Sequence, residues 1–252
     1  MRSSNVWTRE QEILAFDLYF KTPFGKIHHS NPDIMELAKR IGRSPSAVSM
    51  KMCNFANLDP ELDRTGLKNV SKQDREIWAE FNNDWESLVQ EASDIKTRLG
   101  IEQETFDDEE LPEGIDRRSY VKVRRNQDFF RDAVLSAYDN KCCITGIAMP
   151  VLLAASHIKP WRVSDSKTER TNPCNGLSLN YLHDKAFDKG LITLDFDYKI
   201  VISKTLRDRY SSQVISDYFK NYEGKQIMLP SRCLPSKEFL EYHNNYVFEK
   251  IL

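Results

Sequence analysis

Hydrophobic residues recur at helical spacing through residues 9–99, in runs that open on residues typical of helix starts. Thr8 and Gln11 have the spacing of a capping box and predict a helix from residue 9. Asn31 and Ser44 each precede a proline, which combines an N-cap with a first-turn proline, so a short helix is expected after each of them. Ser71 opens a further apolar pattern that predicts one longer helix over residues 71–99. The first half of the chain is therefore expected to be helical.

The two short helices are joined by a tight turn that contains Gly42, as a helix-turn-helix requires. The segment ELAKRIGRSPSAVSMKM, residues 36–52, resembles the helix-turn-helix of many bacterial DNA-binding proteins. In such a unit the second helix enters the major groove, which would place Arg43, Ser46, Ser49 and Lys51 against phosphates or base edges. A plain helical hairpin inside a bundle has the same spacing and is the alternative.

After residue 126 the pattern changes from helices alone to helices mixed with short strands. A helix is expected over residues 127–142, followed by strands over 151–158 and 176–182 with a polar loop between them. A short helix over 183–187 comes next, and the alternating residues 191–203 predict a hairpin with its turn near Asp197. The fold class expected for the whole chain is α+β, with a mainly helical N-terminal domain.

Charge is distributed unevenly although the net charge is only −2. Residues 102–113 carry seven acids and no base, whereas residues 117–125 carry five bases and no acid. Like charges repel and the acidic run has little apolar surface to bury, so residues 101–116 are expected to link a domain 1–100 to a domain 117–252. Arg124 and Arg125 are candidates for contacts to a phosphate backbone. The alternative is that the basic run only balances the acidic one.

Composition argues against two classes of protein. No run approaches the roughly 18 consecutive apolar residues that a membrane span needs. The N-terminal residues MRSSNVWTREQE contain no apolar signal region, and five cysteines without a repeated spacing do not suggest a disulfide framework. A cytoplasmic protein with no membrane partner is expected.

Three short elements follow one another in the second half of the chain. They are ASHIKPW at the end of the first expected strand, NPCNGLSL after the polar loop, and HDKAFDKGLIT on and after the short helix. Together they resemble the HNH endonuclease family, whose core is a ββα-metal motif. The resemblance implies that residues 117–252 contain an HNH nuclease domain, an enzyme that hydrolyses phosphodiester bonds in double-stranded DNA with a divalent metal ion.

The resemblance also implies roles for individual residues. His157 would act as general base toward the attacking water, because an imidazole that titrates near neutral pH suits that task. Asn175 would orient the base through amide hydrogen bonds to the backbone. Members of the family often have an acid or a histidine just before the base, and Ser156 stands there in this chain, which shifts metal binding toward the short helix. The expected catalytic residues are His157, Asn175 and His183, and the expected metal ligands are His183, Asp184, Asp188 and Ser156.

Mg²⁺ is the expected ion, with Mn²⁺ or another divalent ion as alternatives, because Mg²⁺ keeps several waters and needs few protein ligands. Asp184 and Asp188 are four residues apart and share one helical face, although a local cap or ion pair is the alternative role for Asp188. Arg162 and Arg170 in the connecting loop are candidates for clamping phosphate. No structural zinc is expected, because Gly146 stands where many relatives have the second cysteine of a Cys-x2-Cys pair.

The sequence therefore predicts a two-part endonuclease of the restriction-type or modification-dependent kind, in which the helical domain recognises duplex DNA and the HNH domain cuts it. A double-strand cut takes two nicks, so a homodimer or two successive visits is expected. Two alternatives stay open. One is a non-catalytic DNA-binding regulator with a degenerate HNH fold, which Ser156 in place of an acidic ligand favours. The other is a non-specific nuclease that acts as a toxin or defence effector.

Overall fold

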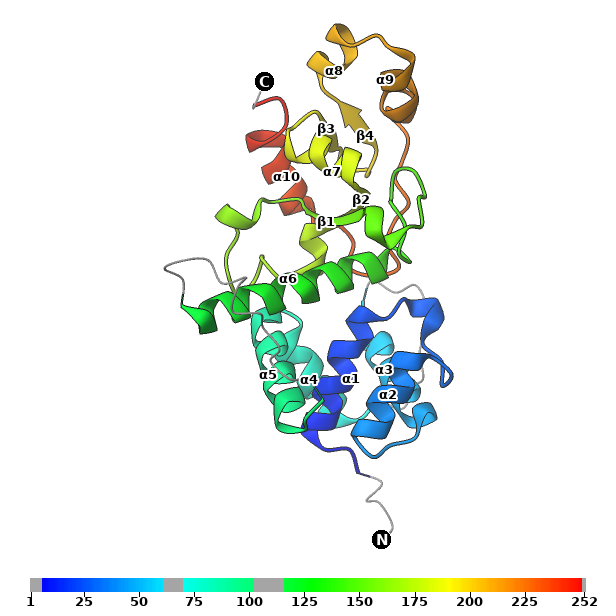
Figure 1. Cartoon of the computed structure of the whole chain (residues 1–252), viewed down its shortest axis with the longest axis vertical. Coiled ribbons are helices and arrows are strands. Elements are labelled where there is room, and N and C mark those ends of the chain that lie inside the picture. Colours follow the sequence, from blue (N-terminus) through cyan, green and yellow to red (C-terminus); the bar gives the residue numbers. More distant parts are fainter. Residues whose placement is uncertain (1–5, 61–69, 102–115, 251–252) are drawn as a thin grey trace. The chain divides into compact units, whose positions relative to one another are not determined.

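The computed structural model describes residues 6–60, 70–101 and 116–250. By its contacts the chain divides into two compact units (Figure 1): unit 1 contains residues 1–136 and 165–172, and unit 2 contains residues 137–164 and 173–252. Unit 1 is mainly helical, and unit 2 combines small β-hairpins with helices, which confirms the expected α+β class. The predicted linker, apart from Ile101 and Asp116, lies outside the described residues.

Unit 1 is built around its first helix, which contacts four of the helices that follow (Figure 1). The predicted capping box of Thr8 and Gln11 is present at its start. Phe16 and Phe20 on this helix lie against aromatic rings of its neighbours, with ring centroids 4.7–6.4 Å apart. None of the described helices is long and apolar enough to cross a membrane. The helices of this unit are α1 Arg9–Lys21, α2 Pro32–Arg40, α3 Pro45–Leu58, α4 Lys72–Phe81, α5 Trp85–Arg98 and α6 Arg117–Ala137.

The single helix predicted over residues 71–99 is two helices, α4 and α5. Asn82 is the C-cap of α4, and the side chain of Asp84 caps α5 by accepting a hydrogen bond of 3.1 Å from the backbone amide of Ser87. Short polar side chains compete with a helix in this way, because they satisfy backbone amides outside it. The apolar spacing continues across the break, with Phe81 and Trp85 both buried, so spacing alone predicted one helix.

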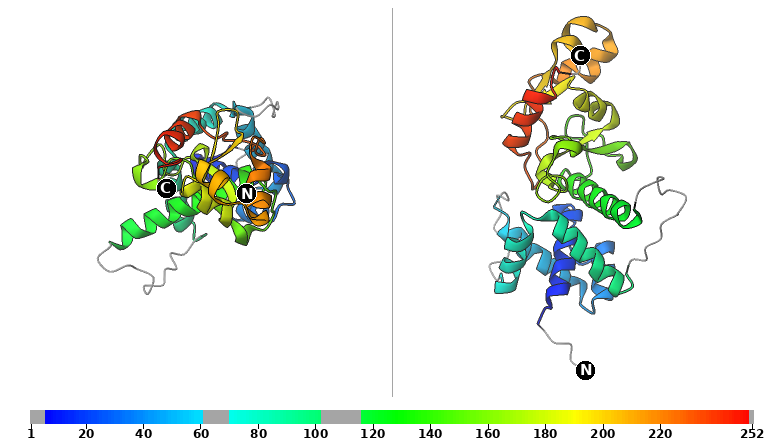
Figure 2. Two further views of the ribbon diagram at one scale, coloured as in Figure 1. Left: turned by 90° about the horizontal axis from the view of Figure 1, so that it is seen from above. Right: turned by 90° about the vertical axis from the view of Figure 1, so that its left-hand side faces the viewer.

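Helix α6 begins ten residues before the predicted start at residue 127 and includes the basic run (Figure 2). It ends before Asp139 and Asn140, whose φ angles of 55° and 56° are left-handed. By their contacts, its residues 117–136 are grouped with unit 1. The packing explains why: the Phe129 ring lies 6.2 Å from that of Trp85, and the hydroxyl of Ser136 donates to the carbonyl oxygen of Phe20.

Unit 2 has two antiparallel hairpins, β1 Leu153–His157 with β2 Gly176–Asn180, and β3 Ile192–Leu194 with β4 Ile200–Ile202. Helix α7, Tyr181–Asp188, follows β2 directly and packs on both strands of the first hairpin. The predicted order of strand, loop, strand, helix and hairpin is confirmed, and Tyr198 at the second turn has a left-handed φ of 60°. The unit continues with α8 Lys204–Arg209, α9 Gln213–Tyr218 and α10 Lys237–Tyr246.

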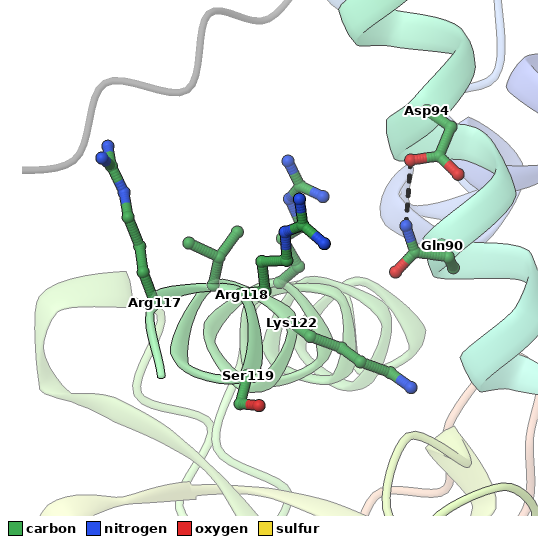
Figure 3. A pocket seen from close by; sticks show the side chains of 8 residues that line it. Gln90, Asp94, Arg117, Arg118, Ser119 and Lys122 are labelled. Atoms are coloured by element: carbon green, nitrogen blue, oxygen red, sulfur yellow. Dashed lines mark hydrogen bonds between the residues drawn. The ribbon is translucent and has the colours of Figure 1, made fainter. Parts of the chain in front are cut away.

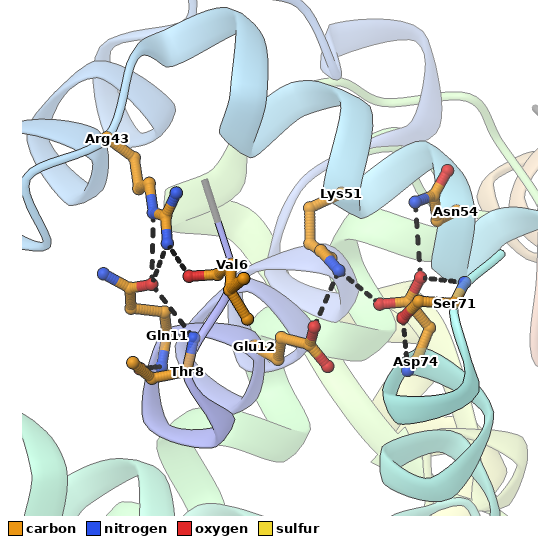
Figure 4. Close-up of polar contacts among 9 residues, drawn as sticks. All are labelled: Val6, Thr8, Gln11, Glu12, Arg43, Lys51, Asn54, Ser71 and Asp74. Carbon is orange, nitrogen blue, oxygen red and sulfur yellow. Dashed lines mark hydrogen bonds and ion pairs between the residues drawn. The ribbon is translucent and has the colours of Figure 1, made fainter. Parts of the chain in front are cut away.

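A buried ion cluster joins three helices of unit 1 (Figure 4). The ammonium group of Lys51 on α3 lies 2.8 Å from a carboxylate oxygen of Glu12 on α1 and also pairs with Asp74 on α4. Asp74 caps its own helix with Ser71 and accepts a further hydrogen bond from Asn54. Lys51 is only 5% exposed. It was predicted to reach DNA, but in the structure it is buried and its single charge is shared between two acids inside the unit.

His243 connects α10, the last helix of unit 2, to α7 and β3. Its ring stacks on that of Phe187 in α7, with centroids 3.8 Å apart and an interplanar angle of 14°. Nε2 lies 3.2 Å from the carbonyl oxygen of Phe187, which can only accept, and Nδ1 lies 2.8 Å from the hydroxyl of Thr193. Burial lowers the pKa of His243 to about 4, against the opposing effect of the carbonyl contact. The folded protein therefore holds this imidazole neutral.

Replacing Lys51 by alanine leaves two buried carboxylates without their cation. Breaking such a buried cluster by removing one partner is expected to lower the free energy of unfolding by about 3–5 kcal/mol at neutral pH. The urea midpoint, followed by circular dichroism, measures it. Lys72→Ala on α4 is the matched control, because that side chain is 91% exposed, and a change within about 0.5 kcal/mol is expected. Equal effects in the two variants would contradict a stabilising role for the cluster.

The low pKa of His243 makes unit 2 sensitive to mild acid. Above pH 6.5 the ring is neutral in both the folded and the unfolded chain, so no stability is lost there. As the pH falls from 6.5 toward 4, the unfolded chain binds a proton that the folded chain excludes. Stability is expected to fall by about 2 kcal/mol between pH 7.5 and 5 from this ring alone.

Urea midpoints at pH 7.5 and 5 measure this loss, and His243→Gln is the comparison. The variant has no titrating ring at this position, so its stability should fall less between the two pH values than that of the wild type. The same loss in both proteins would show that His243 is not responsible.

Candidate active site

The hairpin of β1 and β2 forms the frame of the candidate site in unit 2. The two strands pair in antiparallel register, with His157, the last residue of β1, opposite Gly176, the first residue of β2. The polar loop between them therefore starts and ends beside His157. Within this loop, residues 165–172 are grouped with unit 1, whereas residues 158–164 and 173–175 belong to unit 2.

Asn175 closes the loop next to His157. Its side-chain oxygen accepts a hydrogen bond of 2.8 Å from the backbone amide of Lys159, and its amide nitrogen donates to the carbonyl of the same residue at 3.1 Å. The backbone amide of Ile158 donates to the carbonyl of Asn175 at 2.9 Å. Asn175 is fully buried, and its amide nitrogen lies 3.4 Å from the hydroxyl oxygen of Ser164. These are the backbone contacts expected of a residue that braces the segment after the base.

His157 is half-buried at the end of β1. The ring meets the indole of Trp161 edge to face, with centroids 5.5 Å apart and an interplanar angle of 86°. Trp161 begins a short 3-10 helix, Trp161–Val163, whose next residue, Ser164, donates its hydroxyl to the carbonyl of Lys159 at 3.0 Å. The imidazole thus extends from the end of β1 and contacts the turn that follows it, through Trp161.

The two acids predicted as metal ligands lie on α7, one helical turn apart. Asp184 is half-buried and Asp188 is exposed at the end of the helix. Partial desolvation raises the pKa of Asp188, and repulsion from the charge of Asp184 raises it further. The two carboxylates are therefore close enough to oppose each other's ionisation, and a cation beside them would relieve that repulsion.

His183, which was predicted to be catalytic and to bind the metal, is buried at the first turn of α7. It is 1% exposed. Nε2 lies 2.7 Å from the carbonyl oxygen of Tyr218, so this nitrogen carries the proton, and Nδ1 then accepts from the amide of Asn180 at 2.9 Å. Burial lowers the pKa of His183, which keeps the ring neutral. Both ring nitrogens thus have hydrogen-bond partners within unit 2.

Among the predicted metal ligands, the oxygen donors are the ones that suit a hard divalent ion. Asp184 and Asp188 supply carboxylates, and the buried hydroxyl of Ser156 has no hydrogen-bond partner within the described parts of the chain. Mg²⁺ is held by one or two carboxylates and several waters, so Asp184 and Asp188 by themselves suit this ion. Among the residues that the structure describes, no three His, Cys, Asp or Glu side chains gather as a closed metal site.

The arginine predicted for the helix-turn-helix is engaged inside unit 1 (Figure 4). The guanidinium of Arg43 donates to the side-chain oxygen of Gln11 at 2.8 and 3.1 Å and to the carbonyl of Val6, and it lies 5.0 Å from the centroid of the Trp7 ring. Gln11 in turn donates to the carbonyl of Ile41. Arg43 thereby holds the turn between α2 and α3 against the start of α1.

The remaining predicted DNA contacts are spread over both units. Ser46 is exposed at the start of α3, and Ser49 is half-buried, with its hydroxyl donating to the carbonyl of Ser46 at 3.1 Å. Lys51 is the only base in α3, so this helix has no exposed base. The arginines are distributed as follows: Arg124 is exposed and Arg125 half-buried on α6, Arg162 is exposed in unit 2, and Arg170 is half-buried in the segment grouped with unit 1.

Sequence reasoning missed Trp161 as part of the site. The signal was in the quoted segment, since this aromatic residue follows His157 by four positions, but spacing in a loop does not reveal contact. The tertiary structure supplies this contact.

The model of the HNH endonuclease family matches residues 142–195. The matched range contains β1, β2, α7 and β3, and with them His157, Asn175 and both carboxylates of α7. No curated protein matches the chain at a significant level. The hairpin, the short helix and the residues they carry thus coincide with the matched range, and residues 142–195 form an HNH endonuclease domain.

Proposed function

We propose that this protein is a metal-dependent endonuclease that hydrolyses phosphodiester bonds in duplex DNA. One observation carries the proposal: His157 stands half-exposed at the end of a hairpin strand, braced by Asn175, within the range that matches HNH endonucleases. The restriction-type or modification-dependent role is the further part of the proposal, and it rests on the presence of a second, helical unit.

In this mechanism His157 acts as general base. One ring nitrogen takes a proton from a water molecule as the water oxygen attacks phosphorus, and the bond from phosphorus to the 3′ oxygen breaks. The products carry a 5′-phosphate and a 3′-hydroxyl, the latter after the leaving oxygen gains a proton from solvent. A positioned general base contributes about 10²- to 10⁴-fold to such a step.

The acids of α7 have the second role. Asp184 and Asp188 would hold the divalent ion, with Ser156 as a further oxygen donor. When bound, that ion supplies positive charge to the scissile phosphate and the leaving oxygen. Its presence would also favour the ionised form of Asp188, whose pKa is raised in its absence.

The second candidate function is a DNA-binding regulator without catalysis. The engagement of His183 by Asn180 and Tyr218 favours it, because it removes one expected ligand from the site. A nuclease that cuts without sequence preference, as a toxin or defence effector would, needs no recognition helix. The lack of an exposed base on α3 agrees with that alternative.

His157→Ala is expected to lower the rate of plasmid nicking by about 100-fold or more in the presence of Mg²⁺ or Mn²⁺, because it removes the base. Conversion of supercoiled to open circular plasmid measures the rate, on methylated and unmethylated DNA. His29→Ala changes an exposed loop histidine of unit 1 and is the control, expected to keep full activity.

The outcomes separate the candidate functions. Full activity in His157→Ala would remove the proposed mechanism, and a wild-type protein that cuts neither methylated nor unmethylated plasmid would favour the regulator. Cut sites spread evenly over a sequenced duplex would favour a non-specific nuclease. An open circular form that builds up before the linear form would indicate two successive visits rather than a homodimer that cuts both strands at once.

Trp161 is the residue that positions the base. An edge-to-face aromatic pair contributes about 0.5–1.5 kcal/mol, so Trp161→Ala is expected to lower kcat by about 2- to 12-fold and to leave KM for the plasmid nearly unchanged. Trp161→Phe keeps an aromatic ring against His157 and should restore most of kcat. A rise in KM with unchanged kcat would instead indicate a direct contact between Trp161 and DNA.

A further inference from the structure

A basic cleft of about 600 Å³ lies in unit 1, between α5 and the first half of α6 (Figure 3). We name it the α5–α6 cleft. Its α6 side carries Arg117, Arg118, Lys122 and Arg125, and its α5 side carries Gln90 and Asp94. It is separate from the hairpin site, because all of these residues belong to unit 1.

Positive charge dominates the cleft, with four bases against one acid. That acid, Asp94, accepts a hydrogen bond of 2.9 Å from the side-chain amide of Gln90 on its own helix. Lys122 pairs with Glu86 at 3.0 Å, but its side chain is 49% exposed. An ion pair this exposed contributes little and is easily exchanged, so Lys122 can turn to another anion.

The bases are arranged as a stripe along the helix. Arg118, Lys122 and Arg125 are spaced by four and three residues, which places them on one face of α6. At about 1.5 Å per residue the stripe is about 10 Å long. One strand of DNA carries a phosphate about every 3.4 Å along the axis, so the stripe matches about three successive phosphates.

Two other exposed bases of unit 1 pair with acids on their own helices: Arg40 with Glu36 and Lys72 with Glu76, each within one turn. Residues 117–125 contain no acid at all, so no base of this run pairs with an acid inside the run. The cleft lining includes no aromatic ring, and its one apolar residue is Val121, so it has nothing on which a base could stack.

We propose that the α5–α6 cleft binds phosphates of the DNA backbone and is the surface by which unit 1 binds the substrate. Contacts of this kind position a protein on DNA without reading its sequence. The proposal rests on the proposed function for the identity of the substrate. The DNA contacts of unit 1 would then come from α6 instead of α3, because the only base of α3 is paired with acids inside the unit.

The test measures DNA binding apart from cleavage. The full-length chain is titrated onto a fluorescein-labelled duplex in EDTA, and fluorescence anisotropy gives the affinity over a series of salt concentrations. Arg118→Gln/Lys122→Gln removes two bases of the cleft. Lys72→Gln/Arg75→Gln is the matched control, because it removes two exposed bases three residues apart on α4, one of which is also paired with a glutamate.

The cleft variant is expected to bind more weakly, with the slope of log K against log salt reduced by about 1.8, because each lost phosphate contact removes about 0.9. The control should keep the wild-type slope. Equal slopes in all three proteins, or an equal reduction in the cleft variant and the control, would overturn the proposal.

A free nucleotide is the other source of the same phosphate chemistry, and ATP serves as its probe. If ATP raises the melting temperature of the wild type but not of the cleft variant, while the salt slopes for duplex DNA stay equal, the cleft binds a small ligand and the proposal fails. The plasmid assay is independent of this result. If the wild type nicks plasmid but the cleft variant keeps the wild-type salt slope, only the proposal for the cleft is overturned. If the cleft variant has a reduced salt slope but the wild type does not nick plasmid, only the nuclease proposal is overturned.

Discussion

The candidate site depends on the double hydrogen bond between the side chain of Asn175 and the backbone of Lys159. A loop joins the two strands of the hairpin, and closing a long loop costs conformational entropy. Asn175 is fully buried, so both polar ends of its amide need partners, and Lys159 supplies them through one amide and one carbonyl. Because Lys159 follows His157 by two residues, satisfying the buried amide also fixes the strand end. The path of the backbone just after His157 is thus a consequence of loop closure.

Both units use potentially functional side chains as internal supports. Lys51 neutralises Glu12 and Asp74 between three helices, and His183 connects α7 to the end of α9 through a carbonyl oxygen. In each case a buried polar group is retained because its partners are buried with it, and a lone charge or ring nitrogen inside the protein would be costly. The candidate residues that stay at least partly exposed are His157, the two acids of α7 and the bases of α6.

Local signals in the sequence predicted local structure well. They could not predict contacts between residues that are distant in the sequence. The caps of Thr8, Asn31 and Ser44, and the order of strands and helices in unit 2, follow from neighbouring residues and are confirmed. The break before α5 was missed because apolar spacing runs through it. The burial of Lys51 was missed because its acidic partners lie 39 and 23 residues away, and that of His183 because Tyr218 lies 35 residues later. Sequence spacing carries no information about such pairs.

The stacking of His243 on Phe187 has a consequence for protein synthesis. The two residues are 56 positions apart, so the ribosome completes α7, with its two carboxylates, well before α10 exists. Until then the buried face of α7 lacks the ring that covers Phe187, and a domain generally folds as a unit once its parts have emerged. A nascent or prematurely terminated chain would therefore carry the whole matched range, residues 142–195, without the ring that covers Phe187. The HNH domain thus reaches its final packing only after residues beyond its own range have been synthesised.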